Sequence, residues 1–293
     1  HSLLNASDRT ALISEVAPRI DVVVTSGGGA GIKRALMEQL PKLKLIACFS
    51  VGLDSVDLAA ARELGIAVTN TPDVLTDEVA DLAVGLMLAT SRRIAAADRF
   101  VRAGRWLDGG FALTSKVSGK RLGIVGMGRI GQAIARRAAA FDMQIAWHGP
   151  AKKDLPYRFE PQLVELARSV DFLVAACPGG AATRGLISRE VLTALGSKGI
   201  FINISRGSVV DEAAMVELLV GGQLGGAGLD VFVDEPRVPA ALFNLDNVVC
   251  SSHVAGVTLE ANRQASLQVT AEILKVLRGE RPEVLANPDV WPR

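Results

Sequence analysis

The chain has 293 residues, of which 49% are hydrophobic and 22% charged, and its formal net charge is +1. This composition predicts a globular protein with large buried cores and excludes a disordered chain, and the length favours two domains. Because the charge is nearly balanced and no long run has one sign, nothing indicates nucleic acid or a membrane surface as a partner.

The cysteines and the apolar stretches give a first indication of the compartment. Cys48, Cys177 and Cys250 are odd in number, far apart and each beside a strand-like run. This pattern indicates reduced thiols, so we expect a cytoplasmic protein. The longest apolar stretch, residues 82–90, is too short to span a bilayer, and residues 1–5 lack the pattern of a signal peptide. No CxxC pair or histidine cluster suggests a metal site.

The first third of the chain alternates short apolar runs with helical patterns. Strands are expected at 22–25, 45–49 and 66–69, and helices at 32–40 and 56–64. The glycine-rich segment Ser26–Lys33 resembles a phosphate loop but lacks the Gly-Lys-Ser/Thr ending, so we expect a strand-to-helix turn there. A long helix, from residue 74 to about 100, then leads into the next part of the chain.

The rest of the chain shows a second series of the same kind. Strands are expected at 122–125, 145–147, 172–176, 200–204, 227–232 and 248–250, with helices at 129–141, 162–168, 189–195, 212–220 and about 258–278. Continuous rather than alternating apolar strands are typical of parallel sheets that are covered on both faces. The sequence therefore predicts the α/β class, with two doubly wound parallel-sheet domains.

The most specific motif is Gly126-Met127-Gly128-Arg129-Ile130-Gly131. It follows the expected strand 122–125 and opens the expected helix 129–141, which is the context that a dinucleotide-binding glycine loop requires. Gly126 permits a tight turn, Gly128 lets the backbone approach a pyrophosphate, and Gly131 lets the helix pack on the strand. The N–H groups at the start of the helix would then face the phosphates.

Three polar residues near strand ends could carry the chemistry. His253 ends an expected strand and could donate a proton, although a histidine in such a place is often structural. Glu235 could hold the imidazole in one tautomer, or could be a solvated loop acid. Arg206 could engage a carboxylate and a carbonyl oxygen with its fork of donors, or could cap backbone carbonyls.

These segments resemble the D-isomer-specific 2-hydroxyacid dehydrogenase family over nearly the whole chain. The residues 71–83 look most like the glyoxylate/hydroxypyruvate reductase branch. The resemblance rests on Phe49–Asp54, Thr69–Pro72, the glycine loop, Ile204–Gly207, Gly228–Phe232 with Glu235-Pro236, and His253. It implies a flavodoxin-like substrate domain (1–93 and 262–293), a Rossmann cofactor domain (94–261), and a cleft that closes between them.

The resemblance also implies roles for individual residues. Arg206, Glu235 and His253 would be the catalytic set, and the backbone of Val51 and Gly52, together with Arg206, would hold the substrate carboxylate. In the family, Asp230 approaches the nicotinamide ring, and the Cys177-Pro178 turn lines the cofactor groove. The cofactor-binding residues expected on this basis are Gly126, Gly128, Arg129, Ile130, Gly131, His148, Lys152, Lys153, Cys177, Pro178, Thr183, Ser205, Asp230 and Thr76.

The chain departs from the family pattern in two places. The family begins with a strand before its first helix, and that strand is expected to be missing here. The position of the acid that binds the ribose 2′-OH holds His148 and Gly149, and Lys152, Lys153 and Arg129 could meet a 2′-phosphate instead. We therefore expect NADPH in preference to NADH, although the family's NADP-type members often carry an arginine in this loop and this chain does not.

The expected activity is NADPH-linked reduction of a small 2-oxo acid, glyoxylate or hydroxypyruvate, to its 2-hydroxy acid. The alternatives are an NADH-linked D-2-hydroxyacid dehydrogenase of the lactate or phosphoglycerate type, and a non-enzymatic NAD(H)-sensing protein of the same fold. Family members are usually homodimers, and residues 92–120 look like the dimer arm. Within this arm, Trp106 either anchors the subunit contact, which we favour, or reaches a substrate cleft.

Overall fold

The computed structural model describes residues 1–3, 5–26 and 31–291, and it divides into two compact units. Unit 1 comprises His1–Leu75 and Leu259–Arg293, and unit 2 comprises Thr76–Thr258. The expected first domain, which extends to residue 93, would include the helix α4 (Thr76–Ser91). The structure groups α4 with unit 2 because this helix packs on α6 and on the strands β8 and β9 of that unit.

Unit 1 is built on a parallel sheet whose strands follow one another in chain order. The strands are β1 (Val22–Ser26), β2 (Leu45–Phe49) and β3 (Ala67–Thr69), in the order β1-β2-β3. The helices are α1 (Arg9–Val16), α2 (Arg34–Met37), α3 (Leu58–Glu63) and α10 (Leu259–Leu277), with single 3₁₀ turns at Ala17–Arg19 and Pro288–Val290. Part of the glycine-rich turn expected at 26–33, residues 27–30, lies outside the described residues.

The two faces of this sheet pack on different parts of the chain. On one face, Leu45 and Ala47 contact Val269 and Val276 of α10. On the other face, β2 and β3 pack on residues from α2 and α3. Because alternate residues of β2 enter different cores, the strand is buried on both sides, which explains why its sequence is continuously apolar.

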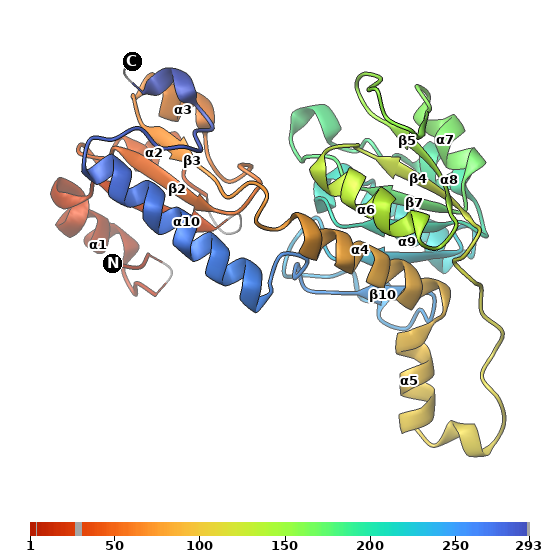
Figure 1. The fold of residues 1–293 in the computed structure, drawn as a ribbon. Helices are drawn as coiled ribbons and strands as arrows, with labels where there is room; N and C mark the ends of the chain where they lie inside the picture. The colour runs from red at the N-terminus through yellow and green to blue at the C-terminus, as the bar shows by residue number, and fades with distance from the viewer. Residues whose placement is uncertain (4, 27–30, 292–293) are drawn as a thin grey trace. The chain divides into compact units, whose positions relative to one another are not determined.

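Unit 2 contains seven parallel strands in the order β10-β9-β8-β7-β4-β5-β6 (Figure 1). They are β4 (Arg121–Val125), β5 (Gln144–His148), β6 (Arg158–Phe159), β7 (Phe172–Ala175), β8 (Ile200–Asn203), β9 (Gly226–Leu229) and β10 (Val248–Cys250). The chain winds outward in one direction from β4 and in the other from β7, so the direction reverses between these neighbours. This is the Rossmann arrangement, which confirms the expected fold and marks the carboxyl ends of β4 and β7 as the ligand-binding crevice.

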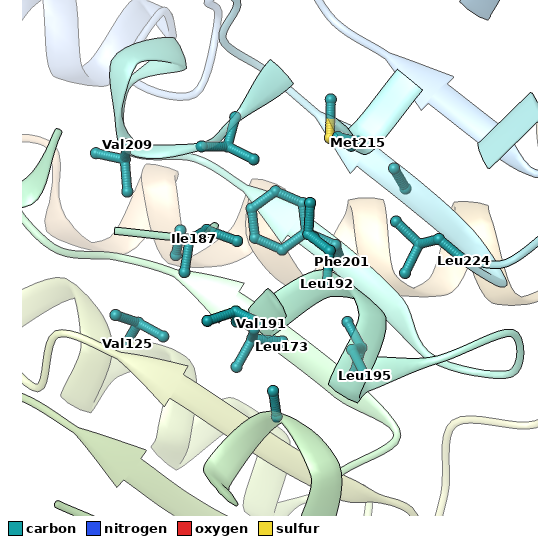
Figure 2. Packing of buried hydrophobic residues seen from close by; sticks show 14 of the residues in the cluster. Val125, Leu173, Ile187, Val191, Leu192, Leu195, Phe201, Val209, Met215 and Leu224 are labelled. Carbon is teal, nitrogen blue, oxygen red and sulfur yellow. The ribbon is translucent and has the colours of Figure 1, made fainter. Parts of the chain in front are cut away.

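Helices cover both faces of the second sheet. α4 and α6 (Arg129–Ala139) pack together on one face, and α7 (Leu163–Ser169), α8 (Arg189–Leu195) and α9 (Glu212–Val220) lie on the other. Figure 2 shows the core between this sheet and the helices α7, α8 and α9, where the ring of Phe201 lies among Leu192, Ile187 and Leu173. Short 3₁₀ turns occur at Arg105–Leu107, Ala181–Thr183, Gly207–Val209 and Ala240–Leu242.

The prediction of one long helix from residue 74 to about 100 is wrong. The structure has two helices, α4 and α5 (Ile94–Arg102), and Arg93 between them is left-handed with φ +50°. No glycine or proline marks this break, so the sequence pattern gave no signal for it. α5 and the segment that follows project away from the sheet of unit 2 (Figure 1).

Smaller differences concern the ends of elements. The first expected helix, 32–40, is shortened to α2, and the strand expected at 227–232 ends at Leu229. The two-residue strand β6 was not expected. Among the described residues, no helix combines the length and the apolar character that a membrane span requires.

Candidate active site

The glycine loop between β4 and α6 has the geometry of a phosphate-binding turn. Gly126 has φ +98°, and a Cβ at this position would lie 2.7 Å from the Cα of Cys177. A Cβ on Gly131 would lie 2.1 Å from the Gly126 carbonyl oxygen, so both glycines are required by close backbone contacts. A Cβ on Gly128, in contrast, would meet no atom within 4 Å.

The open space at Gly128 lies at the start of α6. Gly128 is the N-cap of this helix and no side chain caps it. The N–H groups at the start of a helix and the positive end of its dipole together favour a phosphate at such a place. Arg129 and Ile130 open the helix beside this space, with Arg129 exposed. The residues present thus fit the pyrophosphate of a dinucleotide.

The loop after β5 approaches the glycine loop through Lys153. The Lys153 ammonium donates to the carbonyl oxygen of Met127 at 2.9 Å. His148 Nδ1 donates to the carbonyl oxygen of Glu160 at 3.0 Å, and Lys152 is exposed. Both lysines are exposed, and the structure brings one of them, Lys153, into contact with the glycine loop.

The loops after β7 and β8 are joined by a hydrogen bond. The Ser205 hydroxyl donates to the carbonyl oxygen of Cys177 and so joins the two loops. Within the loop after β7, the Thr183 hydroxyl donates to the carbonyl oxygen of Pro178 at 2.7 Å. Burial raises the pKa of the Cys177 thiol, so this side chain stays neutral. The structure thus links four of the residues expected along the cofactor groove, whereas Thr76 is the first residue of α4.

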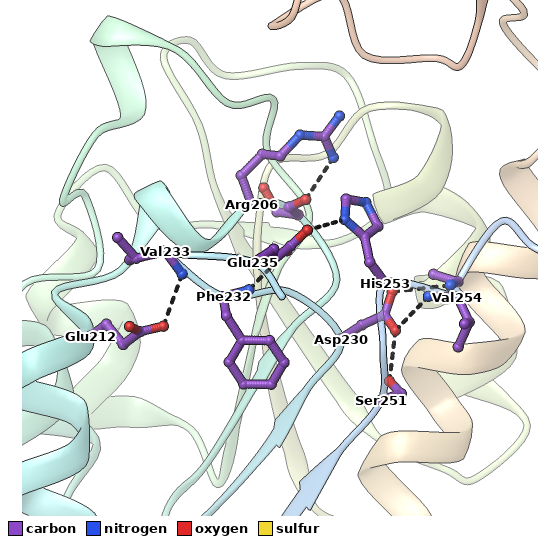
Figure 3. A network of polar contacts seen from close by, with 11 residues as sticks. Arg206, Glu212, Asp230, Phe232, Val233, Glu235, Ser251, His253 and Val254 are labelled. Carbon is purple, nitrogen blue, oxygen red and sulfur yellow. Dashed lines mark hydrogen bonds and ion pairs between the residues drawn. The ribbon is translucent and has the colours of Figure 1, made fainter. Parts of the chain in front are cut away.

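His253 and Glu235 form a hydrogen-bonded pair on two neighbouring loops (Figure 3). His253 Nδ1 lies 2.8 Å from Glu235 Oε2, and the Phe232 N–H donates to Glu235 Oε1 at 3.0 Å. The two side chains of the pair are 42% and 36% exposed. Because the carboxylate accepts a hydrogen bond from the Nδ1–H group, the other ring nitrogen, Nε2, is the one that can serve a substrate.

Asp230 organises the loop that carries His253. It is fully buried, its Oδ1 accepts hydrogen bonds from the Ser251 hydroxyl (2.6 Å) and the Val254 N–H (2.9 Å), and its Oδ2 accepts from the Ala255 N–H (3.0 Å). The backbone N–H of His253 donates to the Asp230 carbonyl oxygen at 2.8 Å. His253 itself is left-handed, with φ +56°, so these contacts hold it in a conformation that few residues adopt.

Arg206 leaves the end of β8 on a turn that the buried Asn203 supports. Asn203 Nδ2 donates to the Arg206 carbonyl oxygen at 3.0 Å, and Asn203 Oδ1 accepts from the Ser205 N–H at 3.1 Å. Arg206 Nη1 donates to the Ser205 carbonyl oxygen at 2.8 Å, as a capping arginine would. A Cβ on Gly207 would lie 2.0 Å from the backbone of Phe232, so the Arg206 turn packs directly on the Glu235 loop.

The loop expected to hold a carboxylate lies in unit 1 and has its carbonyl groups occupied. The Asn70 side chain donates to the Val51 carbonyl oxygen (2.8 Å), the Ser50 hydroxyl donates to that of Gly52 (2.7 Å), and the Thr71 N–H donates to that of Ser50 (3.0 Å). These bonds fix the orientation of the peptide groups, and Gly52 adds no side chain that would screen them. A loop of this kind can present N–H groups to an anion.

Asn70, Asn203 and Ser251 are the supporting residues that the sequence analysis did not identify. Asn70 and Ser251 directly follow an expected strand and Asn203 is next to last in one, which is the one signal that could have drawn attention to them. Burial raises the pKa of the Cys48 thiol to about 12, so it is no nucleophile. In the described part of the chain, no cluster of three or more His, Cys, Asp or Glu side chains could hold a metal ion.

Comparison with known proteins gives these residues a context. The family model for the NAD-binding domain of D-isomer-specific 2-hydroxyacid dehydrogenases matches residues 84–255, more than half of the chain. The chain belongs to the D-isomer-specific 2-hydroxyacid dehydrogenase family. A 2-hydroxyacid dehydrogenase of this kind uses a nicotinamide cofactor, which agrees with the phosphate-binding geometry at Gly128.

Individual relatives place this 2-hydroxyacid dehydrogenase in the glyoxylate/hydroxypyruvate reductase branch. It is 50% identical to glyoxylate/hydroxypyruvate reductase A of Arabidopsis thaliana, over 84% of this chain and 79% of that protein. It is 53% identical to hydroxyphenylpyruvate reductase of Plectranthus scutellarioides, over 82% of this chain and 77% of the relative.

A solved structure shows the same similarity in three dimensions. The NADPH-dependent glyoxylate/hydroxypyruvate reductase of Sinorhizobium meliloti, in complex with NADP and malonate, is 40% identical with a TM-score of 0.90. The match covers 96% of this chain and 88% of that one. The chain is therefore an NAD(P)-dependent enzyme that reduces 2-oxo acids.

Proposed function

We propose that this dehydrogenase reduces glyoxylate or hydroxypyruvate to the 2-hydroxy acid and prefers NADPH. The single observation that carries the proposal is the His253–Glu235 pair, 2.8 Å apart, in the domain that contains the glycine loop. The relatives named for these substrates, and the relative solved with NADP, support the choice of substrate and cofactor.

In this proposal, unit 2 supplies the acid–base chemistry and unit 1 holds the substrate carboxylate. The N–H groups of Val51 and Gly52 bind the carboxylate together with Arg206, an assignment that rests on the family resemblance. The Arg206 guanidinium also binds the carbonyl oxygen and stabilises the negative charge that develops there. A bound reduced nicotinamide supplies the hydride.

The proton comes from His253. Its Nε2 donates a proton to the carbonyl oxygen, while Glu235 accepts a hydrogen bond from the Nδ1–H group and stabilises the charged imidazole. Asp230 holds the loop of His253 through its three hydrogen bonds, so the ring is oriented before the substrate binds. The glycine loop, Arg129 and Ile130 bind the pyrophosphate, and Lys152 and Lys153 meet the 2′-phosphate of NADPH.

We further propose that the protein is a cytoplasmic homodimer. The odd number and wide separation of the three cysteines support a reducing compartment. The segment after α4 exposes Leu107 (94%) and Leu113 (98%) with Trp106 (68%), and a second copy of the chain would cover these side chains.

The test is steady-state oxidation of NADPH and of NADH with glyoxylate, hydroxypyruvate, pyruvate and hydroxyphenylpyruvate in parallel. The expected result is turnover of the first two substrates with a lower KM for NADPH. Turnover with NADH alone would contradict the role of Lys152 and Lys153. A clear preference for hydroxyphenylpyruvate would favour the activity of the Plectranthus relative instead.

A further inference from the structure

The loop that carries Glu235 is held by a second carboxylate that has no part in the proposed reaction. Glu212 is the first residue of α9, and its Oε2 accepts a hydrogen bond from the Val233 N–H at 3.0 Å (Figure 3). The preceding N–H, that of Phe232, donates to Glu235 Oε1. Two consecutive backbone donors of one loop are therefore oriented by two different carboxylates.

Glu212 is not needed to begin its helix. Asp211 is the N-cap of α9, and its Oδ1 accepts from the Ala214 N–H at 3.0 Å. This bond already supplies the side-chain cap that stabilises such a helix end. The carboxylate of Glu212 points instead at a loop 21 residues further along the chain.

Val233 has little else to anchor it. Its side chain is 57% exposed, so hydrophobic burial does not fix this residue. On its other side the loop meets the Arg206 turn, because a Cβ on Gly207 would lie 2.4 Å from the Val233 nitrogen. Since the turn at Gly207–Val209 leads into α9, Glu212 ties the Arg206 turn to the Glu235 loop.

We propose that Glu212 is a positioning residue that sets the orientation of Glu235 toward His253. Without the bond to Val233, the peptide groups of 232 and 233 can rotate together, and Glu235 Oε1 loses its fixed donor. The opposite oxygen, Oε2, then no longer holds the imidazole at one distance and angle. This inference rests on the proposed proton donation by His253.

The test compares Glu212→Ala, Glu212→Gln and Glu217→Gln in the full-length enzyme. Glu212→Ala is expected to lower kcat about threefold to tenfold, the range that one lost hydrogen bond supports, with little change in KM for the cofactor. Glu212→Gln keeps a carbonyl acceptor for the Val233 N–H and is expected to restore kcat. Glu217→Gln, on the same helix and paired with Arg189, is the matched control and should match the parent.

The pH profile of kcat separates positioning from a loss of stability. The charged groups around the pair are Arg206, Asp230 and Glu212, with the exposed Asp234–Arg237 pair on the same loop. Glu212→Ala should move the alkaline limb of the reduction profile to lower pH, in the direction of Glu235→Gln. Added to Glu235→Gln, it should cause no further shift of that limb.

Two outcomes would overturn the inference: a Glu212→Gln variant as slow as Glu212→Ala, or an additive shift in the double variant. His253→Gln, measured in parallel, distinguishes this failure from that of the proposed function. If His253→Gln loses activity while Glu212→Ala does not, only the role of Glu212 is wrong. If His253→Gln retains kcat within about tenfold, the proton donor itself is wrong.

Discussion

At the scale of single residues, Glu235 divides its two oxygens between its own loop and the imidazole of His253. Because the carboxylate stabilises the charged ring that donates the proton, replacing it by a neutral amide should weaken this donor most at alkaline pH. We expect Glu235→Gln to move the alkaline limb of kcat for reduction downward. His253→Gln should lower kcat by about 10²–10⁴, the usual contribution of a proton donor.

The measurement is kcat across pH for both variants with saturating 2-oxo acid. Asp234→Asn is the matched control, because Asp234 is the neighbour of Glu235 and pairs only with the exposed Arg237 in the described structure. An unchanged alkaline limb in Glu235→Gln would contradict the role of this carboxylate. An equal shift in Asp234→Asn would show that any negative charge on the loop has the same effect.

Lys152 and Lys153 should behave differently from one another. Both lysines are exposed, and Lys153 also donates to the Met127 carbonyl oxygen of the glycine loop, so it supports this loop for either cofactor in addition to its proposed contact with the 2′-phosphate. The proposed role of Lys152 is the 2′-phosphate alone. We expect Lys152→Ala to raise the KM for NADPH about tenfold, as the loss of one charged hydrogen bond would, and to leave the KM for NADH unchanged. Lys153→Ala should raise the KM for both cofactors. Initial-rate kinetics with the two cofactors test this, with Lys198→Ala as control.

At the scale of elements, Arg121 and Asp171 join the starts of β4 and β7 beneath the cofactor crevice. The guanidinium binds both carboxylate oxygens (3.1 and 2.9 Å), and the Arg121 N–H donates to Asp171 Oδ2 at 2.9 Å. The hydrogen bonds from Arg121 lower the pKa of Asp171 below its ordinary value. The ionised form is therefore more stable in the folded state than in the unfolded one.

This shift predicts a pH-dependent contribution to stability. A lowered carboxyl pKa contributes stability that is present above the unfolded value, about 3.9, and is lost as the pH falls through the folded value. Asp171→Asn should therefore cost about 1 kcal/mol at pH 7, and the difference should shrink at acid pH. Calorimetry at pH 7 and at acid pH measures this, and Asp246→Asn should cost less because the Asp246 side chain is 58% exposed, against 25% for Asp171. A pH-independent difference would contradict the explanation.

The elements were predictable where a local pattern decides them. Strands β2, β4 and β10 are short apolar runs, and the structure has them within a residue of the expected bounds. The strand β6 was not predicted because it has only two residues, of which Arg158 is charged and Phe159 packs on Trp147 of the neighbouring strand. The break at Arg93 was not predicted because the left-handed residue there is an arginine, and no glycine or proline marks the end of α4.

For the candidate site, the sequence could predict at which edge of the sheet the residues lie, but not which partners they bind. Parallel strands place the residues that follow them along one edge of the sheet, so Arg206 and His253 could be assigned to that edge from the sequence. The partners of these residues could not be assigned. The bonds from Asp230 to Ser251, Val254 and Ala255 join residues that are more than 20 positions apart, and no local pattern encodes them.

At the scale of the whole molecule, the segment that projects from unit 2 should decide the oligomeric state. Leu107 and Leu113 are almost fully exposed, and Val101 of α5 is 52% exposed. Side chains of this kind cost free energy in water unless a partner covers them. We therefore expect the native enzyme to have twice the 30.8 kDa mass of the chain in solution.

The double variant Leu107→Glu/Leu113→Glu should convert this dimer to a folded monomer, because burying two carboxylates in an apolar contact is unfavourable. Light scattering after size exclusion measures the mass, and cofactor binding reports that unit 2 remains folded. Leu267→Glu, on the exposed side of α10 in unit 1, is the matched control and should remain dimeric. A monomeric parent would contradict the homodimer, and a monomeric Leu267→Glu variant would move the contact to unit 1.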